Sequence, residues 1–156
     1  MPNWCMGELA VYGDRKQLDK FRKLMGKNGL DADKIIPYPK EFKGKDRIAA
    51  AYERAHPKDW QGKPKDGFNQ GGYDWCCNNW GTKWGFCEVE VLSHKDDDYA
   101  EYAFMTAWSP ITPVIRRMGE MFPKLKFSYT FKEDGMSFAG AFVIDGKVIT
   151  DTSYDI

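Results

Sequence analysis

The sequence predicts an α+β fold in which an antiparallel sheet carries two helices on one face. Several segments alternate apolar and polar residues, as strands with one buried face do. Two other segments repeat apolar residues at helical spacing, one directly after the first strand segment and one between later strand segments. Turn residues, such as Asp145-Gly146, separate neighbouring strand segments in the final third of the chain.

Length and composition favour a single domain over residues 1–156. The chain is long enough to bury a core without disulfides or a structural metal. Hydrophobic residues make up 42% and charged residues 29% of it, which is typical of a globular protein and excludes a disordered one. No apolar run approaches the roughly 20 residues that a membrane-spanning helix needs.

The first residues lack a basic segment followed by an apolar core, so no secretory signal is expected and a cytoplasmic location is predicted. The four cysteines are then expected to be reduced thiols. Lys plus Arg equal Asp plus Glu at 23 each, so an anion-binding site must be local. The aromatic share of 15%, with six Trp, indicates an interface or a ligand-binding face.

The first strand is predicted over residues 4–12, with Leu9 and Val11 on its buried face. Asp14 is suited to cap a helix that runs to about Lys27. Asn28-Gly29 is expected to end that helix.

An insertion is predicted over about residues 35–80. Its two prolines fix an extended segment at 35–39, residues 47–56 are Ala-rich and helical, and residues 60–72 form a loop. A short helix is expected over 73–80. Because the insertion has few apolar residues, we expect it to lie against the sheet and to shape a pocket or a lid.

Residues 86–92 and 100–108 form the clearest predicted hairpin, joined by a polar turn. Ser109 and Thr112 are expected to cap the second helix, which Pro123 ends.

Three further strands are predicted over residues 125–131, 136–144 and 147–151. The element order is therefore β-α-(insertion)-β-β-α-β with one or two extra C-terminal strands. This is the order of the split βαβ, or ferredoxin-like, arrangement.

Five segments together resemble the YubB ferredoxin-like-domain proteins carried by plasmids and bacteriophages. They are Met1–Cys5, Ile36–Pro39, Asn79–Trp84, Thr106–Pro110 and Phe122-Pro123. The resemblance spans nearly the whole chain. It implies a ferredoxin-like fold and an origin in a mobile element, and it implies no established reaction.

For a mobile-element protein of a host bacterial cell, the resemblance favours a binding role such as sequestering a nucleotide immune signal to counter host defence. No P-loop, dinucleotide fingerprint or hydrolase motif is present, so a non-enzymatic role is favoured and no catalytic residue or cofactor is predicted. The adjacent Cys76-Cys77 pair does not have zinc-ribbon spacing, so no metal site is predicted either.

The candidate ligand site lies in a Trp-rich segment and in the end of the hairpin that faces it. Antiparallel pairing brings the residue before one strand close to the residue after the other, so Trp84 and Trp108 should be neighbours. The candidate residues are Asn78, Asn79, Trp80, Thr82, Lys83, Trp84, Trp108 and Ser109. Trp4 is ranked below them, on the expectation that the first strand runs parallel to the third.

Indole walls, amide groups and the Lys83 ammonium could together hold a small planar anionic ligand. An equally weighted interpretation is that the tryptophans seal the end of the sheet while Asn and Thr satisfy turn backbone groups.

Two other roles are open. A single-stranded nucleic acid could stack on sheet aromatics, namely Tyr102, Phe104, Phe127, Tyr129 and Phe131. Alternatively, the Trp-rich face could dock on a host protein. The last strand leaves a free sheet edge that could support a homo-oligomer.

Overall fold

The computed structural model describes residues 3–156, which form one six-stranded antiparallel sheet in the order β2-β3-β1-β4-β5-β6. Its strands are β1 (Trp4–Tyr12), β2 (Cys87–Val91), β3 (Tyr99–Ala107), β4 (Lys126–Glu133), β5 (Phe138–Asp145) and β6 (Val148–Asp155). Its helices are α1 (Arg15–Met25), α2 (Ala32–Ile35), α3 (Lys40–Ala55), the 3₁₀ helix η1 (Phe68–Gln70), α4 (Gly72–Asn79) and α5 (Thr112–Met121).

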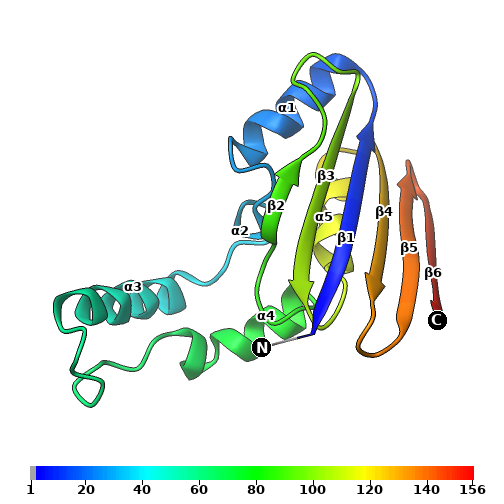
Figure 1. The fold of residues 1–156 in the computed structure, drawn as a ribbon. Helices are drawn as coiled ribbons and strands as arrows, with labels where there is room; N and C mark the ends of the chain where they lie inside the picture. Colours follow the sequence, from blue (N-terminus) through cyan, green and yellow to red (C-terminus); the bar gives the residue numbers. More distant parts are fainter. Residues whose placement is uncertain (1–2) are drawn as a thin grey trace.

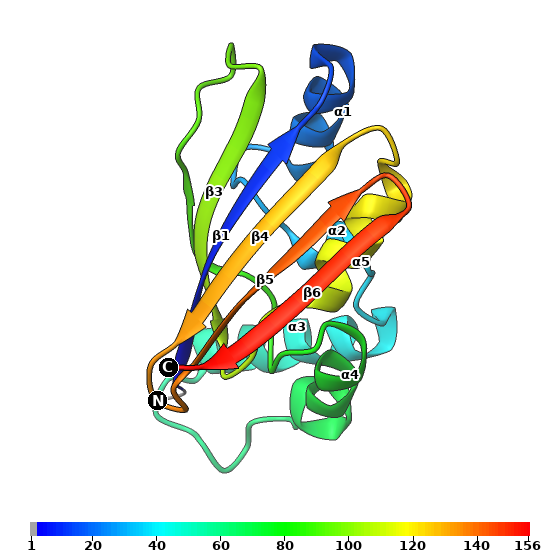
Figure 2. The same ribbon diagram turned by 90° about the vertical axis from the view of Figure 1, so that its right-hand side faces the viewer.

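The order β2-β3-β1-β4 is that of the split βαβ fold, and β5 and β6 extend the sheet beyond β4. Helices α1 and α5 cover the same face of the sheet (Figures 1 and 2). Phe21 of α1 packs edge-on against Phe127 of β4 and Phe122 at the end of α5. The predicted fold class, with two helices on one face and one or two extra C-terminal strands, is confirmed, and the extra strands are two.

Strand β1 lies at the centre of the sheet and alternates as predicted, with Leu9 and Val11 fully buried. It pairs with β3 in antiparallel register, so that Trp4 lies opposite Ala107. The expectation of a parallel pair was wrong. In the split βαβ unit β1 runs parallel to β2, and β3 lies between them in the opposite direction.

Helix α1 begins as predicted, because the side chain of Asp14 accepts a hydrogen bond from the Gln17 amide at 3.1 Å. It ends earlier than predicted, at Gly26, whose φ of 79° favours glycine. The Lys34 ammonium then donates to the free Met25 carbonyl at 3.0 Å.

Helix α3 is longer than predicted and lies apart from the sheet. It begins at Lys40, because charged residues with high helix propensity precede the Ala-rich part. It packs on η1 and projects away from the sheet (Figure 1). The expectation that the whole insertion lies against the sheet was therefore wrong. Ile35, Cys76 and Trp80 are buried in the main core and Phe68 packs against it, whereas no residue of α3 belongs to that cluster.

Helix α5 buries the predicted stripe of Val114, Ile115 and Met118. Ser109 and Thr112 do not cap it, because the residue at the cap position is Ile111 and no side chain accepts there. Strand β6 continues to Asp155, four residues beyond its predicted end. Within residues 3–156, no helix is both long and apolar enough to cross a membrane.

Candidate functional site

The predicted ligand site is a corner of the molecule where the Trp-rich segment before β2 meets Trp108 after β3. Lys83 is at its centre. Its ammonium lies 4.9 Å from the ring centroid of Trp84 and 4.8 Å from that of Trp108, and Tyr73 of α4 approaches it at 5.9 Å. The segment before β2 and the residue after β3 therefore meet, which confirms that Trp84 and Trp108 are neighbours. Tyr73 was not predicted. Its only signal in the sequence is its position at the start of the helix that leads into the Trp-rich segment.

Two hydroxyl groups tie the two halves of this corner together. Thr82, which is 1% exposed, donates through Oγ1 to the Ala107 carbonyl at 2.8 Å. Ser109 donates through Oγ to the Gly81 carbonyl at 2.6 Å. Both hydroxyl protons are thus used inside the protein, so Thr82 and Ser109 position the corner and offer no free donor to a ligand.

Trp80 and Asn79 are also engaged within the protein. The indole Nε1 of Trp80 donates to the Ile36 carbonyl at 2.9 Å, and the side chain is only 7% exposed. The side-chain amide of Asn79 donates through Nδ2 to the Trp75 carbonyl at 2.8 Å. The contacts of these two residues are those that the sealing interpretation expects. Asn78, near the end of α4, is exposed to solvent.

Trp84 is partly buried between two other aromatic rings. The rings of Trp4 and Phe68 each lie 6.4 Å from it, centroid to centroid. Trp4 therefore belongs to this end of the sheet, and its lower rank was wrong because β1 runs antiparallel to β3. The corner is formed by the residues before β2 and after β3, by the start of β1 and by the insertion.

Trp108 combines exposure with backbone strain. Its side chain is 39% exposed, and its φ of 68° lies in the left-handed region, which bulky residues rarely adopt. Its amide donates to the Asn3 carbonyl at 2.9 Å, which helps to hold this conformation. Such a conformation costs of order 1–3 kcal/mol and is concentrated at functional sites.

The Lys83 ammonium is flanked by aromatic rings rather than by carboxylates. None of the ion pairs formed among residues 3–156 includes it. Aromatic faces attract a cation without cancelling its charge. The corner therefore presents one uncompensated positive charge beside the exposed indole of Trp108.

The five aromatic residues suggested as a nucleic-acid platform are buried on the helix-covered face of the sheet. Tyr102, Phe104, Phe127, Tyr129 and Phe131 are at most 6% exposed. That platform was therefore assigned to the wrong face. The strand pattern fixes which residues share a face, but both faces of this sheet carry aromatic or apolar residues, so the pattern does not say which face the helices cover.

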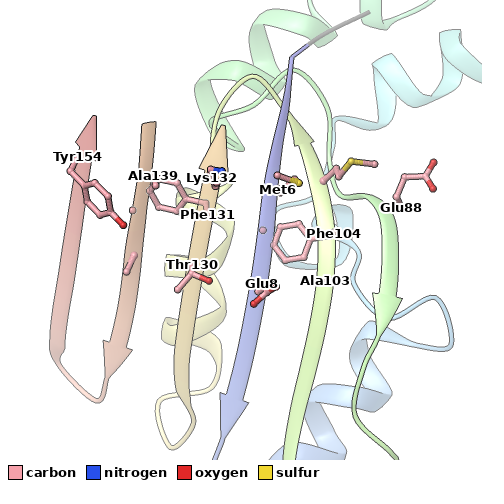
Figure 3. A pocket seen from close by; sticks show the side chains of 14 residues that line it. Met6, Glu8, Glu88, Ala103, Phe104, Thr130, Phe131, Lys132, Ala139 and Tyr154 are labelled. Carbon is pink, nitrogen blue, oxygen red and sulfur yellow. The ribbon is translucent and has the colours of Figure 1, made fainter. Parts of the chain in front are cut away.

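The opposite, open face of the sheet holds a groove of about 650 Å³ that crosses the middle of the sheet (Figure 3). Met6, Met105 and Tyr154 give it an apolar floor, and Glu8 lies on the same face. This groove was not predicted from the sequence. Its signal is the alternation in β1 and β3 that places methionine and alanine on the solvent side.

The cysteines are free thiols, and two of them are buried. Burial raises the pKa of Cys5 and of Cys76 to about 11, so both stay protonated at neutral pH and are poor nucleophiles. Within the described part of the chain, no group of three or more His, Cys, Asp or Glu side chains is arranged to hold a metal ion.

Comparison with known proteins supports the fold. Residues 88–155 match the family model described as a ferredoxin-like domain in Api92-like protein. The crystal structure of a protein api92 from Yersinia pseudotuberculosis is similar over 100% of this chain and 98% of its own, with a TM-score of 0.61 and 10% identity. No curated protein sequence matches the chain. By its sheet order and by these two matches, the chain has a ferredoxin-like fold.

Proposed function

We propose that the chain is a non-enzymatic binding protein that holds a small planar anionic ligand at Lys83 and Trp108. The observation that carries this proposal is the Lys83 ammonium, which lies 4.8 Å from the centroid of a half-exposed indole and has no carboxylate partner among residues 3–156. An anionic group would supply the missing counter-charge, and a planar ring would stack on Trp108.

The ligand class follows from these two contacts. A phosphate or carboxylate pairs with an ammonium, and stacking of a base on an aromatic side chain contributes about 1–3 kcal/mol. A nucleotide has both an anionic group and a planar ring. The strained backbone at Trp108 adds support, because the fold maintains an unfavourable φ to present this ring.

The proposed site is smaller than the set of candidate residues. Lys83 and Trp108 would contact the ligand, while Trp84 and Tyr73 would hold the ammonium in place. Thr82 and Ser109, whose hydroxyl groups donate within the corner, would hold its two halves together.

The biological role we propose is sequestration of a nucleotide immune signal by a protein of plasmid or phage origin in a bacterial cell. The support for this origin is the resemblance of the Asn79–Trp84 and Thr106–Pro110 segments to the YubB proteins. Simple sequestration requires no catalytic group.

Titration of the purified protein with a panel of mono-, di- and cyclic nucleotides tests the proposal, with Trp fluorescence and calorimetry as readouts. We expect one member of the panel to bind at micromolar concentration with one ligand per chain. Lys83→Met should weaken binding at least about tenfold, which corresponds to 1.4 kcal/mol.

Lys63→Met is the matched control. Lys63 also lies over an indole, at 5.9 Å from the ring centroid of Trp60, but its ammonium pairs with Glu53 at 2.7 Å. Its loss should leave binding unchanged. The proposal is wrong if Lys83→Met and Trp108→Ala, both folded, bind the nucleotide as tightly as the parent. Recovery of chemically altered nucleotide would instead indicate an enzyme.

A further inference from the structure

The two edges of the sheet differ in their protection against pairing with another strand. The β2 edge has only five residues, and its register with β3 shifts between Cys87 and Glu90. Glu88 in this bulge has a φ of 50°, and both glutamates are exposed. Short length, a bulge and charge are the usual devices that block edge-to-edge association.

Strand β6 is neither short nor bulged, and its only charged residues are Asp151 and Asp155. It pairs with β5 over eight residues without a shift of register, and every one of its residues is exposed. It contains no Pro, Lys or Arg. No other helix or strand of residues 3–156 lies along its outer side (Figure 2). Its large side chains are open to solvent, with Val148 at 67% and Tyr154 at 62% exposure.

The hydrogen bonds to β5 show which backbone groups of β6 are free. The Ile156 amide donates to the Ser137 carbonyl at 2.8 Å, across the same ladder in which Ala139 lies opposite Tyr154. Backbone groups in an antiparallel ladder point alternately to the two sides. Even-numbered residues of β6 therefore bond to β5, and odd-numbered residues point their N–H and C=O groups outward. The outward residues are Ile149, Asp151, Ser153 and Asp155.

We propose that two copies of this chain pair through β6 in antiparallel register, about a twofold axis perpendicular to the sheet at Thr152. Such an axis keeps each face of the sheet continuous, so even-numbered residues of one copy lie opposite even-numbered residues of the other, and odd-numbered residues opposite odd-numbered ones. Asp151 of one copy then lies opposite Ser153 of the other. The exposed Val148 lies opposite Ile156, which is 53% exposed.

The two neighbouring registers are disfavoured by charge. An axis at Asp151 places two copies of that carboxylate directly opposite each other. An axis at Ser153 places Asp151 opposite Asp155. Like charges at directly opposite positions destabilise a strand pair. The register centred on Thr152 pairs each outward carboxylate with Ser153 or Ile149, and each hydrogen-bonded pair exchanges two backbone bonds.

This arrangement would also bring the open faces of two sheets together in one surface. Tyr154 lines the groove on that face, and it would lie opposite Thr150 of the second copy. The Lys83 corner lies beside β2 and β3, at the opposite edge of the sheet from β6, so pairing through β6 does not involve it.

Analytical ultracentrifugation of the full chain between 1 and about 100 µM tests the proposal. We expect a reversible dimer. Ser153→Asp places a carboxylate opposite Asp151 at both symmetric positions, and it should raise the dimer dissociation constant about tenfold. Adding Asp151→Lys to that variant should restore the dimer, because opposite charges would then face each other.

Ser153→Pro provides a second test. It removes an outward N–H only, so the bonds between β5 and β6 are kept, while each of the two symmetric Asp151–Ser153 pairs between the copies loses one of its two backbone bonds. Circular dichroism would check that the fold is unchanged. A parent protein that is monomeric at the highest concentration, or a Ser153→Asp variant that dimerises like the parent, would overturn the proposal.

Discussion

The hydrogen bond from Thr82 to Ala107 can be removed without changing the groups proposed to bind the ligand. Its contribution to the stability of the corner can therefore be measured separately. Thr82 Oγ1 donates to the Ala107 carbonyl at 2.8 Å, and the two residues are 1% and 0% exposed. Thr82→Val keeps the shape of the side chain but leaves that carbonyl without this donor. A buried polar group without a partner costs about 1–3 kcal/mol. We expect the free energy of unfolding to fall by about 2 kcal/mol, and the melting temperature by about 4–8 °C.

Urea denaturation followed by Trp fluorescence measures this change. Thr82→Ser is the control, because it keeps the hydroxyl and removes one methyl group, which costs about 1 kcal/mol. Lys83→Met should show the opposite behaviour, with little loss of stability and weaker ligand binding. If Thr82→Val is as stable as the parent while Thr82→Ser is less stable, the hydrogen bond does not support the corner.

Three other perturbations test the packing and the buried charges. In Gly119→Ala of α5, the added Cβ would lie 2.7 Å from the Cδ1 of Ile144, so we expect a loss of about 1 kcal/mol in thermal denaturation, partly recovered when Ile144→Val is added. Burial raises the pKa of Cys5 from 9.0 to about 11, so its protonated thiol contributes stability that is present below pH 9 and is lost as the pH rises through 11. In Cys5→Ala, urea titrations across that pH range should show a smaller decline in the free energy of unfolding. Glu133 is 1% exposed and its carboxylate accepts from the Met136 amide in the turn after β4, so Glu133→Ala should cost about 3 kcal/mol of unfolding free energy, and a loss below 1 kcal/mol would show that the turn does not need it.

The sheet could be predicted from the sequence because its signals are local. Alternation marks β1, and the spacing of Val114, Ile115 and Met118 marks α5. The extent of α3 and the direction in which it projects could not be predicted. A charged helix with a narrow apolar face has no strong preference for the sheet, and its position depends on contacts with η1 that are distant in sequence.

The candidate site was predicted in part for a similar reason. Hairpin geometry was enough to bring Trp84 and Trp108 together. It does not show where each polar group finds its partner. Trp80, for example, donates to Ile36, a residue 44 positions earlier in the chain. A group that a sequence presents as a free donor can thus be satisfied by a distant carbonyl, and only the fold shows this.

The central position of β1 has a consequence for the synthesis of the protein. This strand is made before both of its neighbours, β3 and β4, so its second edge stays unpaired until residue 133 has been translated. At about 5–20 residues per second, that interval is roughly 6–24 seconds. Throughout it, β1, whose Leu9 and Val11 are fully buried in the folded protein, lacks one of its neighbouring strands. Nascent chains of this protein are therefore expected to need a chaperone until β4 has been made.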